Sequence, residues 1–374
     1  MWVAASMAAA MAAIGCVLVL AATAATRRFG RQLHAPHPPA PTVPVTILKP
    51  LHGAEPRLAE NVRGFAEQAW PAPVQIVAGV QRGDDPAIDA IRPLGDAITL
   101  VCDSRRHGAN AKIGNVINMM AAARHDIIVL SDSDIAVPPD YLARVVSALA
   151  EPGVGAVTCA YVGRGDAGPW SHFGAAMLSY HFLPSVMFSL RVGVGDVCMG
   201  STIALRRETL AAIGGFERFA DVLADDHAIG AAVRALRLRV AVAPVLVTHG
   251  CTETSLGALL RHELRWSATV RDLRPAGHVG ALLLHPLPLA LAALALAPGT
   301  ATGALVAATI GIRIASAHMI DPIAGVPAIP LWLLPLRDLM SFGVHFASLF
   351  VRTVDWRGAR LDMRPEGRIE PRAQ

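Results

Sequence analysis

Long apolar stretches lie toward both ends of this chain. Between them, apolar and polar residues alternate over shorter distances. Residues 2–26 contain no charged side chain, and a helix of that length crosses the roughly 30 Å hydrocarbon core of a bilayer. A second apolar block runs from residue 277 to residue 351 and is broken by prolines. We therefore predict a membrane anchor at residues 1–26 and further membrane segments within 277–351.

Turn-forming dipeptides divide the second block. Pro298-Gly299 and Asp321-Pro322 predict breaks, which leave segments at 277–298, 300–320 and 324–351. The last segment carries Arg337 and Asp338 in its middle, and these charges are costly in lipid unless they pair or face protein. We expect this segment to be bent or re-entrant.

Between residues 41 and 270 the pattern changes to short β-rich runs that alternate with helical stretches. Strands are expected at 43–48, 74–80, 98–102, 126–131 and 156–160, and helices at 58–68, 113–123 and 141–149. This alternation predicts an α/β domain, Rossmann-like, whose mainly parallel sheet is covered on both faces. Ligands on such sheets bind at the carboxyl ends of the strands.

The charge pattern orients the chain in the membrane. Arg27, Arg28 and Arg31 follow the first apolar run, which places the domain at 41–270 in the cytoplasm by the positive-inside rule. A cleaved signal peptide is the alternative, because Ala22-Thr23-Ala24 resembles a cleavage site, but no basic region precedes the apolar run. The basic tail at 352–374 favours a cytoplasmic end, whereas three simple crossings would leave it outside.

Composition excludes several classes of function. With 53% apolar and 17% charged residues, the chain is more apolar than one soluble core requires. The net charge of +4 is mild and the arginines flank apolar segments, so we expect contact with the lipid bilayer and no nucleic-acid partner. The five cysteines show no C-x-x-C spacing, which indicates neither a zinc site nor a disulfide framework.

Paired carboxylates follow the predicted strands. Asp84-Asp85 comes after the strand at 74–80, and Asp132-Ser133-Asp134 after the strand at 126–131. A D-x-D at a strand end can hold Mg²⁺ or Mn²⁺ against the diphosphate of a nucleotide sugar, and His249 is a candidate third ligand. Helix capping is the alternative role, although the next helix is expected to begin near Asp140.

A second acidic pair, Asp225-Asp226, begins a helical stretch. Sugar transfer to an alcohol needs a base for the hydroxyl proton, and one of two adjacent acids can have its pKa raised by the other. Asp226 is our candidate base. Stabilisation of the helix dipole is the alternative role for this pair.

Taken together, these residues resemble the ceramide glucosyltransferase family, membrane-bound relatives of the GT-A glycosyltransferases. The matching stretches cover most of residues 41–266 and lie at 47–53, 81–89, 110–115, 132–134, 225–226 and 265–266. The resemblance implies a GT-A fold and transfer from a UDP-sugar to the hydroxyl of a membrane lipid. It places Asp85 at the uracil nucleotide, Asp132 at the phosphates and metal, and Asp226 as the base.

The family's terminal Q/R-x-x-R-W motif falls on residues 262–266, with His262 at the first position. By this resemblance Arg265 and Trp266 clamp the diphosphate and the acceptor, and His262 contributes to nucleotide binding. Lys49 and Lys112 lie in matching motifs and would neutralise phosphate, unless they are ordinary surface lysines.

Two acceptors fit the resemblance. Asp134 stands where ceramide enzymes tend to have glycine, and the His-Glu-x-Arg-Trp form of the last motif is similar to the bacterial hopanoid-biosynthesis branch. That branch implies transfer of N-acetylglucosamine from UDP-N-acetylglucosamine to bacteriohopanetetrol by a multi-pass protein of the bacterial inner membrane. The alternatives are a ceramide glucosyltransferase using UDP-glucose, a processive polysaccharide synthase and an inactive scaffold.

The apolar stretch at 174–195 is interleaved with polar residues such as His181. We expect it to lie in the membrane plane rather than to cross. His181 would then lie near the lipid acceptor, or serve as an ordinary core histidine.

Overall fold

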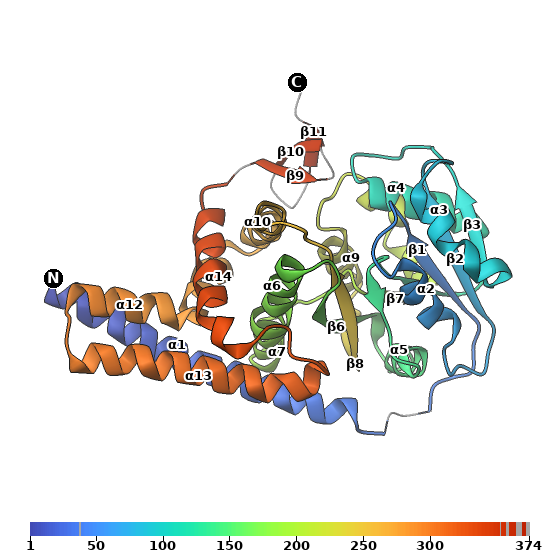
Figure 1. Ribbon diagram of the computed structural model, residues 1–374. Coiled ribbons are helices and arrows are strands. Elements are labelled where there is room, and N and C mark those ends of the chain that lie inside the picture. The colour runs from blue at the N-terminus through green and yellow to red at the C-terminus, as the bar shows by residue number, and fades with distance from the viewer. Residues whose placement is uncertain (37–38, 352, 357–358, 364–368, 372–374) are drawn as a thin grey trace.

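The computed structural model describes residues 1–36, 39–351, 353–356, 359–363 and 369–371. One eight-stranded sheet forms the centre of an α/β domain, and long helices lie to one side of it (Figure 1). Its strands are β1 (Val45–Pro50), β2 (Val74–Val80), β3 (Ile98–Cys102), β4 (Ile127–Leu130), β5 (Ile135–Ala136), β6 (Val154–Gly165), β7 (Ile203–Arg206) and β8 (Arg239–Cys251). Their order is β3-β2-β1-β4-β7-β6-β8-β5.

The sheet is mixed, with a parallel majority among its pairings. β1 pairs in parallel with β2 and β4, β2 with β3, and β6 with β8, whereas β7 is antiparallel to both of its neighbours. Leu48 of β1 lies opposite Leu130 of β4, and Pro50 lies opposite Gly79 of β2. The carboxyl ends of these three strands therefore meet at one edge, as predicted for a mainly parallel α/β sheet.

Alternating side chains bury both faces of the sheet. On one face Ile47 and Val129 pack with α2 (Leu58–Ala66) and α5 (Tyr141–Leu149) in a common core. On the other face Leu48 and Leu130 pack against α4 (Ala111–Met119). The domain is completed by α3 (Pro86–Ile91), α8 (Arg207–Ala212) and α9 (Asp225–Ala235). The predicted cover on both faces is confirmed.

Apolar helices from the two ends of the chain lie side by side (Figure 1). α1 (Trp2–Leu33) packs against α12 (Pro286–Leu296) and α13 (Thr300–Ala324). α1 and α13 are long and apolar enough to cross a membrane. α11 (Pro275–Ala281), a 3₁₀ turn at Leu282–Leu284, and α12 form a helix pair bent by 65° that could make one further span.

Residues 169–191 form one continuous helical segment, whereas the stretch at 174–195 was predicted to lie in the membrane plane. It comprises α6 (Pro169–Met177), a π-helical turn at Leu178–Phe182 and α7 (Leu183–Arg191). By length and composition it qualifies as a span, yet 61% of its apolar window is buried inside the protein. It packs on β6 and α1, and so joins the sheet to the apolar helices.

The predicted break at Asp321-Pro322 is wrong. α13 continues through Pro322 to Ala324 and ends before Gly325, which has a φ of +87°. Proline has no backbone N–H, so α13 lacks one intrahelical hydrogen bond in its last turn. The Asp321 carboxylate also accepts a hydrogen bond from the Tyr180 hydroxyl at 2.5 Å, which fixes this end of the helix.

The last apolar segment, expected at 324–351, is not one straight helix. After a 3₁₀ turn at Leu331–Leu333 it forms α14 (Leu334–Ser348), whose 15 residues span only about 22 Å. Arg337 and Asp338 are buried but form their ion pairs with other helices. Arg337 binds Glu263 at 2.7 Å and Asp338 binds Arg313 at 2.7 Å.

The end of the chain forms a small antiparallel sheet in its described residues, with β9 (Thr353–Trp356), β10 (Ala359–Met363) and β11 (Ile369–Pro371). Most arginines of the predicted basic tail at 352–374 lie outside the described residues: Arg352, Arg357, Arg364, Arg368 and Arg372.

Gly163 allows β6 and α6 to approach closely. A Cβ atom at this position would lie 2.3 Å from the Ala175 Cα and 2.7 Å from its carbonyl oxygen. We expect Gly163→Ala to lower the free energy of unfolding by about 1–3 kcal/mol, because rigid backbone atoms must move apart. Gly64→Ala in α2 is the control, since its nearest neighbour would be 3.6 Å away. Equal melting temperatures of the two variants in detergent would contradict this account of the packing.

Candidate active site

Lys49 supports the loop that follows β4. It projects from β1, and its ammonium group is buried, donates to the backbone carbonyl of Asp132, and lies 4.1 Å from the centre of the Phe65 ring. Burial lowers the pKa of Lys49 to about 8, although the nearby Asp134 and Asp132 oppose this shift. In the structure Lys49 therefore holds the Asp132–Asp134 loop in place through its hydrogen bond to the backbone of that loop.

Lys112 joins two of the predicted carboxylates. Its Nζ lies 2.8 Å from Asp132 Oδ1 and 3.1 Å from Asp225 Oδ2. Burial lowers the pKa of Lys112, but the charges of Asp132 and Asp225 outweigh burial and raise the pKa above its ordinary value. Asn110 accepts from Ile113 N at 3.1 Å, which caps α4, and donates to Val222 O at 2.7 Å. α4 is thereby held against the loop before α9.

Asp226 lies in the first turn of α9. Its Oδ2 accepts from Gly200 N at 2.9 Å and its Oδ1 from His227 N at 2.7 Å. Burial and the neighbouring Asp225 raise the pKa of Asp226 to about 6, while Lys112 opposes the shift. This direction agrees with the expectation from the adjacent acids, with burial as the larger cause.

Gly200 marks the point where the separately predicted carboxylates meet. A Cβ atom there would lie 3.2 Å from Asp132 Oδ2, 3.5 Å from Asp226 Oδ2 and 3.6 Å from Lys112 Nζ. The missing side chain leaves space between these groups. No motif in the sequence analysis contained Gly200, and only its place before β7 could have suggested it.

Asp134 lies beside His249. Asp134 Oδ1 is 3.5 Å from His249 Nδ1, and the pairing of Ile135 with His249 between β5 and β8 holds the two segments together. Burial raises the pKa of Asp134, and Asp132 adds to this effect against the opposing influence of His249. Asp134 Oδ1 is buried and has no hydrogen-bond partner, so negative charge here is incompletely compensated.

Asp85 connects two loops at the same edge of the sheet. Its Oδ1 accepts from Ala87 N at 2.9 Å, which caps α3, and from Gly53 N at 2.8 Å. Its Oδ2 lies 3.4 Å from His52 Nδ1. Asp84, by contrast, forms an exposed ion pair with Arg82. Asp85 is thus fixed between the ends of β1 and β2, on the edge that also carries Asp132.

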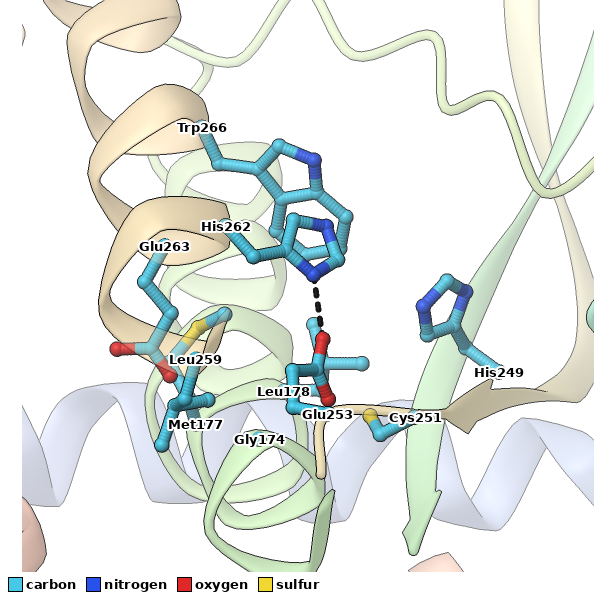
Figure 2. Close-up of a pocket in the computed structure, with 10 residues that line it drawn as sticks. All are labelled: Gly174, Met177, Leu178, His249, Cys251, Glu253, Leu259, His262, Glu263 and Trp266. Carbon is cyan, nitrogen blue, oxygen red and sulfur yellow. Dashed lines mark hydrogen bonds and ion pairs between the residues drawn. The ribbon is translucent and has the colours of Figure 1, made fainter. Parts of the chain in front are cut away.

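The last motif lies on α10 (Leu256–Leu273), which carries Arg265, Trp266 and His262. The Trp266 ring meets the His262 ring edge-on at 4.4 Å and lies 5.8 Å from His249. His262 Nδ1 is 2.5 Å from Glu253 Oε1, as the dashed line in Figure 2 shows. Sequence reasoning missed Glu253, because no motif distinguishes this acid in the segment between β8 and α10.

Aromatic rings connect this motif to the carboxylates. Tyr161 of β6 stacks on Phe182 at 4.6 Å and lies 5.8 Å from the His249 ring. Burial, with the charges of Asp226 and Asp132, raises the pKa of Tyr161 well above its ordinary value. A row of neighbouring rings therefore runs along the site, formed in order by Phe182, Tyr161, His249, Trp266 and His262.

A solved structure shares the architecture of the chain. The mannosyltransferase PcManGT from Pyrobaculum calidifontis, determined with GDP-Man and Mn²⁺, aligns with a TM-score of 0.52 at 23% identity. The alignment covers 91% of this chain and 99% of that chain. The likeness confirms the GT-A fold that the sequence predicted.

Two curated relatives are similar in sequence. Ceramide glucosyltransferase 1 of Caenorhabditis elegans is 25% identical over 234 residues, which are 60% of this chain and 48% of that protein. The ceramide glucosyltransferase of Komagataella phaffii is 30% identical over 132 residues, which are 33% of this chain and 26% of that protein. The chain thus spans about half the length of the first relative (48%) and about a quarter of the second (26%).

The family is shown over nearly the whole sequence. The family model described as glycosyl transferase family 21 matches residues 7–369, which include both the α/β domain and the apolar helices. This chain therefore belongs to glycosyl transferase family 21.

Proposed function

We propose that this chain is an inverting membrane glycosyltransferase that moves a sugar from a UDP-sugar to a hydroxyl group of a lipid. The observation that carries the proposal is the meeting of Asp132, Lys112 and Asp226 around Gly200. In this cluster Asp226 is a carboxylate with a raised pKa that can take the proton of the acceptor hydroxyl. Lys112 is a cation that can bind the phosphates of the sugar donor. Both groups lie at the edge of the sheet where ligands of α/β domains bind.

The proposed reaction needs a single base. Asp226 accepts the proton of the lipid hydroxyl while that oxygen attacks the anomeric carbon from the face opposite the diphosphate. The bond from the anomeric carbon to the diphosphate oxygen breaks, and UDP leaves with its electron pair. Lys112 and Arg265 neutralise the departing charge, and Trp266 borders the acceptor. No carboxylate nucleophile is required.

The residues around Asp134 fit a divalent cation, Mg²⁺ or Mn²⁺. Asp134 Oδ1 is buried without a hydrogen-bond partner, and hard cations prefer oxygen ligands of this kind. Asp132 and Asp134 would hold the ion, with His249 beside them, and when bound it would neutralise charge on the diphosphate. Within the described part of the chain, no three His, Cys, Asp or Glu side chains form a metal cluster. The remaining ligands would therefore come from the donor and water.

The UDP-sugar would occupy the same edge of the sheet. By the resemblance Asp85 lies at the uracil and Arg265 at the diphosphate, and His262 contributes to nucleotide binding. Lys49 acts on the donor only through the Asp132–Asp134 loop, because its ammonium group is buried under that loop. We infer the same division of the chain as the sequence predicts: an anchor at 1–26, a cytoplasmic domain at 41–270 and membrane segments at 277–351.

The pH dependence of turnover follows from Asp226. The base must be ionised, so kcat/KM is expected to fall as the pH drops through about 6, where burial and Asp225 place the pKa of Asp226. The charge of Lys112 lowers the pKa of Asp226. In Lys112→Met this pKa should therefore be higher, and the fall of kcat/KM on the acidic side of the pH profile should occur at higher pH. Arg105→Met, which breaks an exposed ion pair with Asp103, is the control. An unshifted limb in Lys112→Met would argue against Asp226 as the base.

The acceptor has two candidates. The form of the last motif resembles the hopanoid branch and supports N-acetylglucosamine transfer to bacteriohopanetetrol in a bacterial inner membrane. The names of the two curated relatives support glucose transfer to ceramide as the second candidate, for which the donor would be UDP-glucose. Purified protein in detergent should be offered both donors with both lipids, and the products identified by mass spectrometry. We expect N-acetylhexosaminyl-hopanoid; glucosylceramide would keep the reaction class and overturn the acceptor.

A further inference from the structure

A small pocket beside the proposed active site shares His249, His262 and Trp266 with it, but the reaction above gives no role to the pocket's two glutamates. It lies between the end of β8, the segment formed by α6 and the π-helical turn, and α10 (Figure 2). We call it the Glu253 pocket, and its lining combines polar side chains such as Glu253, Glu263 and His262 with apolar ones such as Met177, Leu178 and Leu259.

Two buried carboxylates face this pocket with one oxygen each unpartnered. Glu253 is 8% exposed; its Oε1 binds His262, and its Oε2 has no hydrogen-bond partner. Glu263 is 5% exposed; its Oε2 accepts from Arg337 at 2.7 Å, and its Oε1 has no partner. Buried polar atoms are rarely left in this state, because desolvation without a hydrogen bond is costly. The pocket thus offers two carboxylate oxygens without hydrogen-bond partners.

Gly174 keeps the space beside the Glu253 carboxylate open. A Cβ atom at position 174 would lie 3.0 Å from Glu253 Oε2 and 3.5 Å from Cys251 Sγ. Any residue other than glycine would therefore occupy the place from which a donor can reach Oε2. Gly174 lies inside α6, where glycine weakens a helix relative to alanine, so local helix stability does not explain its presence.

The charge of Glu253 is fixed by its partner. Burial raises the pKa of Glu253, but the hydrogen bond and charge of His262 outweigh burial and bring the pKa below its ordinary value. Glu253 is accordingly an acceptor at neutral pH. An ionised carboxylate accepts hydrogen bonds and donates none.

A hydroxyl group fits these acceptors better than a metal ion. One wall of the pocket is apolar, with Met177, Leu178 and Leu259, and such a wall supplies no oxygen ligand for a hard cation. The pocket adjoins the proposed active site, because His249 lies in its wall and contacts Asp134. An amphiphile that carries hydroxyls on an apolar body matches both parts of the lining.

We propose that the Glu253 pocket binds a second hydroxyl group of the lipid acceptor, distinct from the one that is glycosylated, and so selects lipids with a polyhydroxylated head group. Glu253 Oε2 accepts the hydrogen bond of this hydroxyl, and Gly174 provides its space. The inference rests on the proposed function, since it assigns the acceptor class of the same reaction.

Binding without turnover tests the pocket directly. The full chain in detergent micelles is titrated with dodecane-1,2,3,4-tetrol and with dodecan-1-ol, and the dissociation constants are measured by calorimetry. We expect the tetrol to bind roughly tenfold more tightly or better, as hydrogen bonds to a charged acceptor allow. Gly174→Ala and Glu253→Gln should each lose this preference while their affinity for dodecan-1-ol is unchanged. Gly64→Ala, in a helix with room for the methyl group, should keep it.

The melting temperature of Gly174→Ala, compared with that of Gly64→Ala, separates a loss of binding from a loss of folding. Alanine favours the helix, whereas the new Cβ would lie 3.0 Å from the Glu253 carboxylate. A tetrol preference that persists in both pocket variants, or that the unmutated protein lacks, would overturn the inference. The transfer assay keeps the two proposals apart. In a protein that transfers sugar, Gly174→Ala should raise KM for the acceptor and leave KM for the UDP-sugar unchanged. A protein that shows the tetrol preference but no transfer would refute the reaction and retain the pocket.

Discussion

Asp226→Asn is expected to lower kcat by about 10²- to 10⁴-fold, the contribution of a positioned general base. Asparagine keeps the size of the side chain and one oxygen that can accept from Gly200 N, but it cannot take up the acceptor proton. Affinity for the UDP-sugar should change little, because Lys112, Asp132 and Asp134 remain. Turnover and donor binding should be measured on the same preparation.

Asp84→Asn is the matched control for this variant. It makes the same chemical change in an exposed carboxylate that pairs with Arg82, and its turnover should stay within about twofold of the unmutated protein, as for most surface changes. Asp226→Asn protein with full turnover would require another base. A parallel loss of donor affinity and turnover would show that Asp226 acts in binding.

Arg313→Met should lower the free energy of unfolding by about 3–5 kcal/mol, since it removes the permanent charge that pairs with the buried Asp338 and leaves His181, 2.9 Å away, as its remaining partner. Arg313 Nε and Nη2 bind the two oxygens of Asp338 at 2.7 and 2.8 Å, and both residues are at least 95% buried, with exposures of 5% and 2%. Arg313 also donates to Tyr180 O at 3.3 Å. The ion pair thus ties α13 and α14 to the π-helical turn.

The double variant Arg313→Met with Asp338→Leu tests the physical reason. Replacing both charges by apolar side chains removes the uncompensated carboxylate, so most of the lost stability should return. Thermal unfolding in detergent measures both variants. Equal destabilisation in the single and double variants would instead indicate that hydrogen bonds such as the one to Tyr180 dominate.

The strands around the candidate site could be predicted because their patterns are local. Residues 74–80 and 98–102 are strands and 141–149 is a helix with the predicted bounds. The predicted strand at 156–160 is the middle of the longer β6. β7 and β8 were not among the predicted strands. β7 has only four residues. β8 contains Pro244 and is apolar almost throughout residues 240–247, so its sequence shows no alternation although its burial alternates over residues 243–249.

The acids of the site could be predicted for a different reason. Each follows a strand or begins a helix, and parallel strands bring their ends to one edge. What sequence could not supply were groups defined by contact alone. Gly200 lies between Asp132 and Asp226, and Glu253 holds His262, yet neither residue belongs to a pattern. The partners of Arg337 and Asp338 likewise come from helices far apart in the sequence.

Anomeric configuration of the product tests the central claim most directly. Purified protein is supplied with α-linked UDP-N-acetylglucosamine and bacteriohopanetetrol, with UDP-glucose and ceramide as the parallel pair, and the glycolipid is examined by proton NMR. Attack opposite the diphosphate, with Asp226 as the single base, predicts a β-linked product. An α-linked product would contradict the account, because retention requires a different mechanism from the one that these carboxylates support.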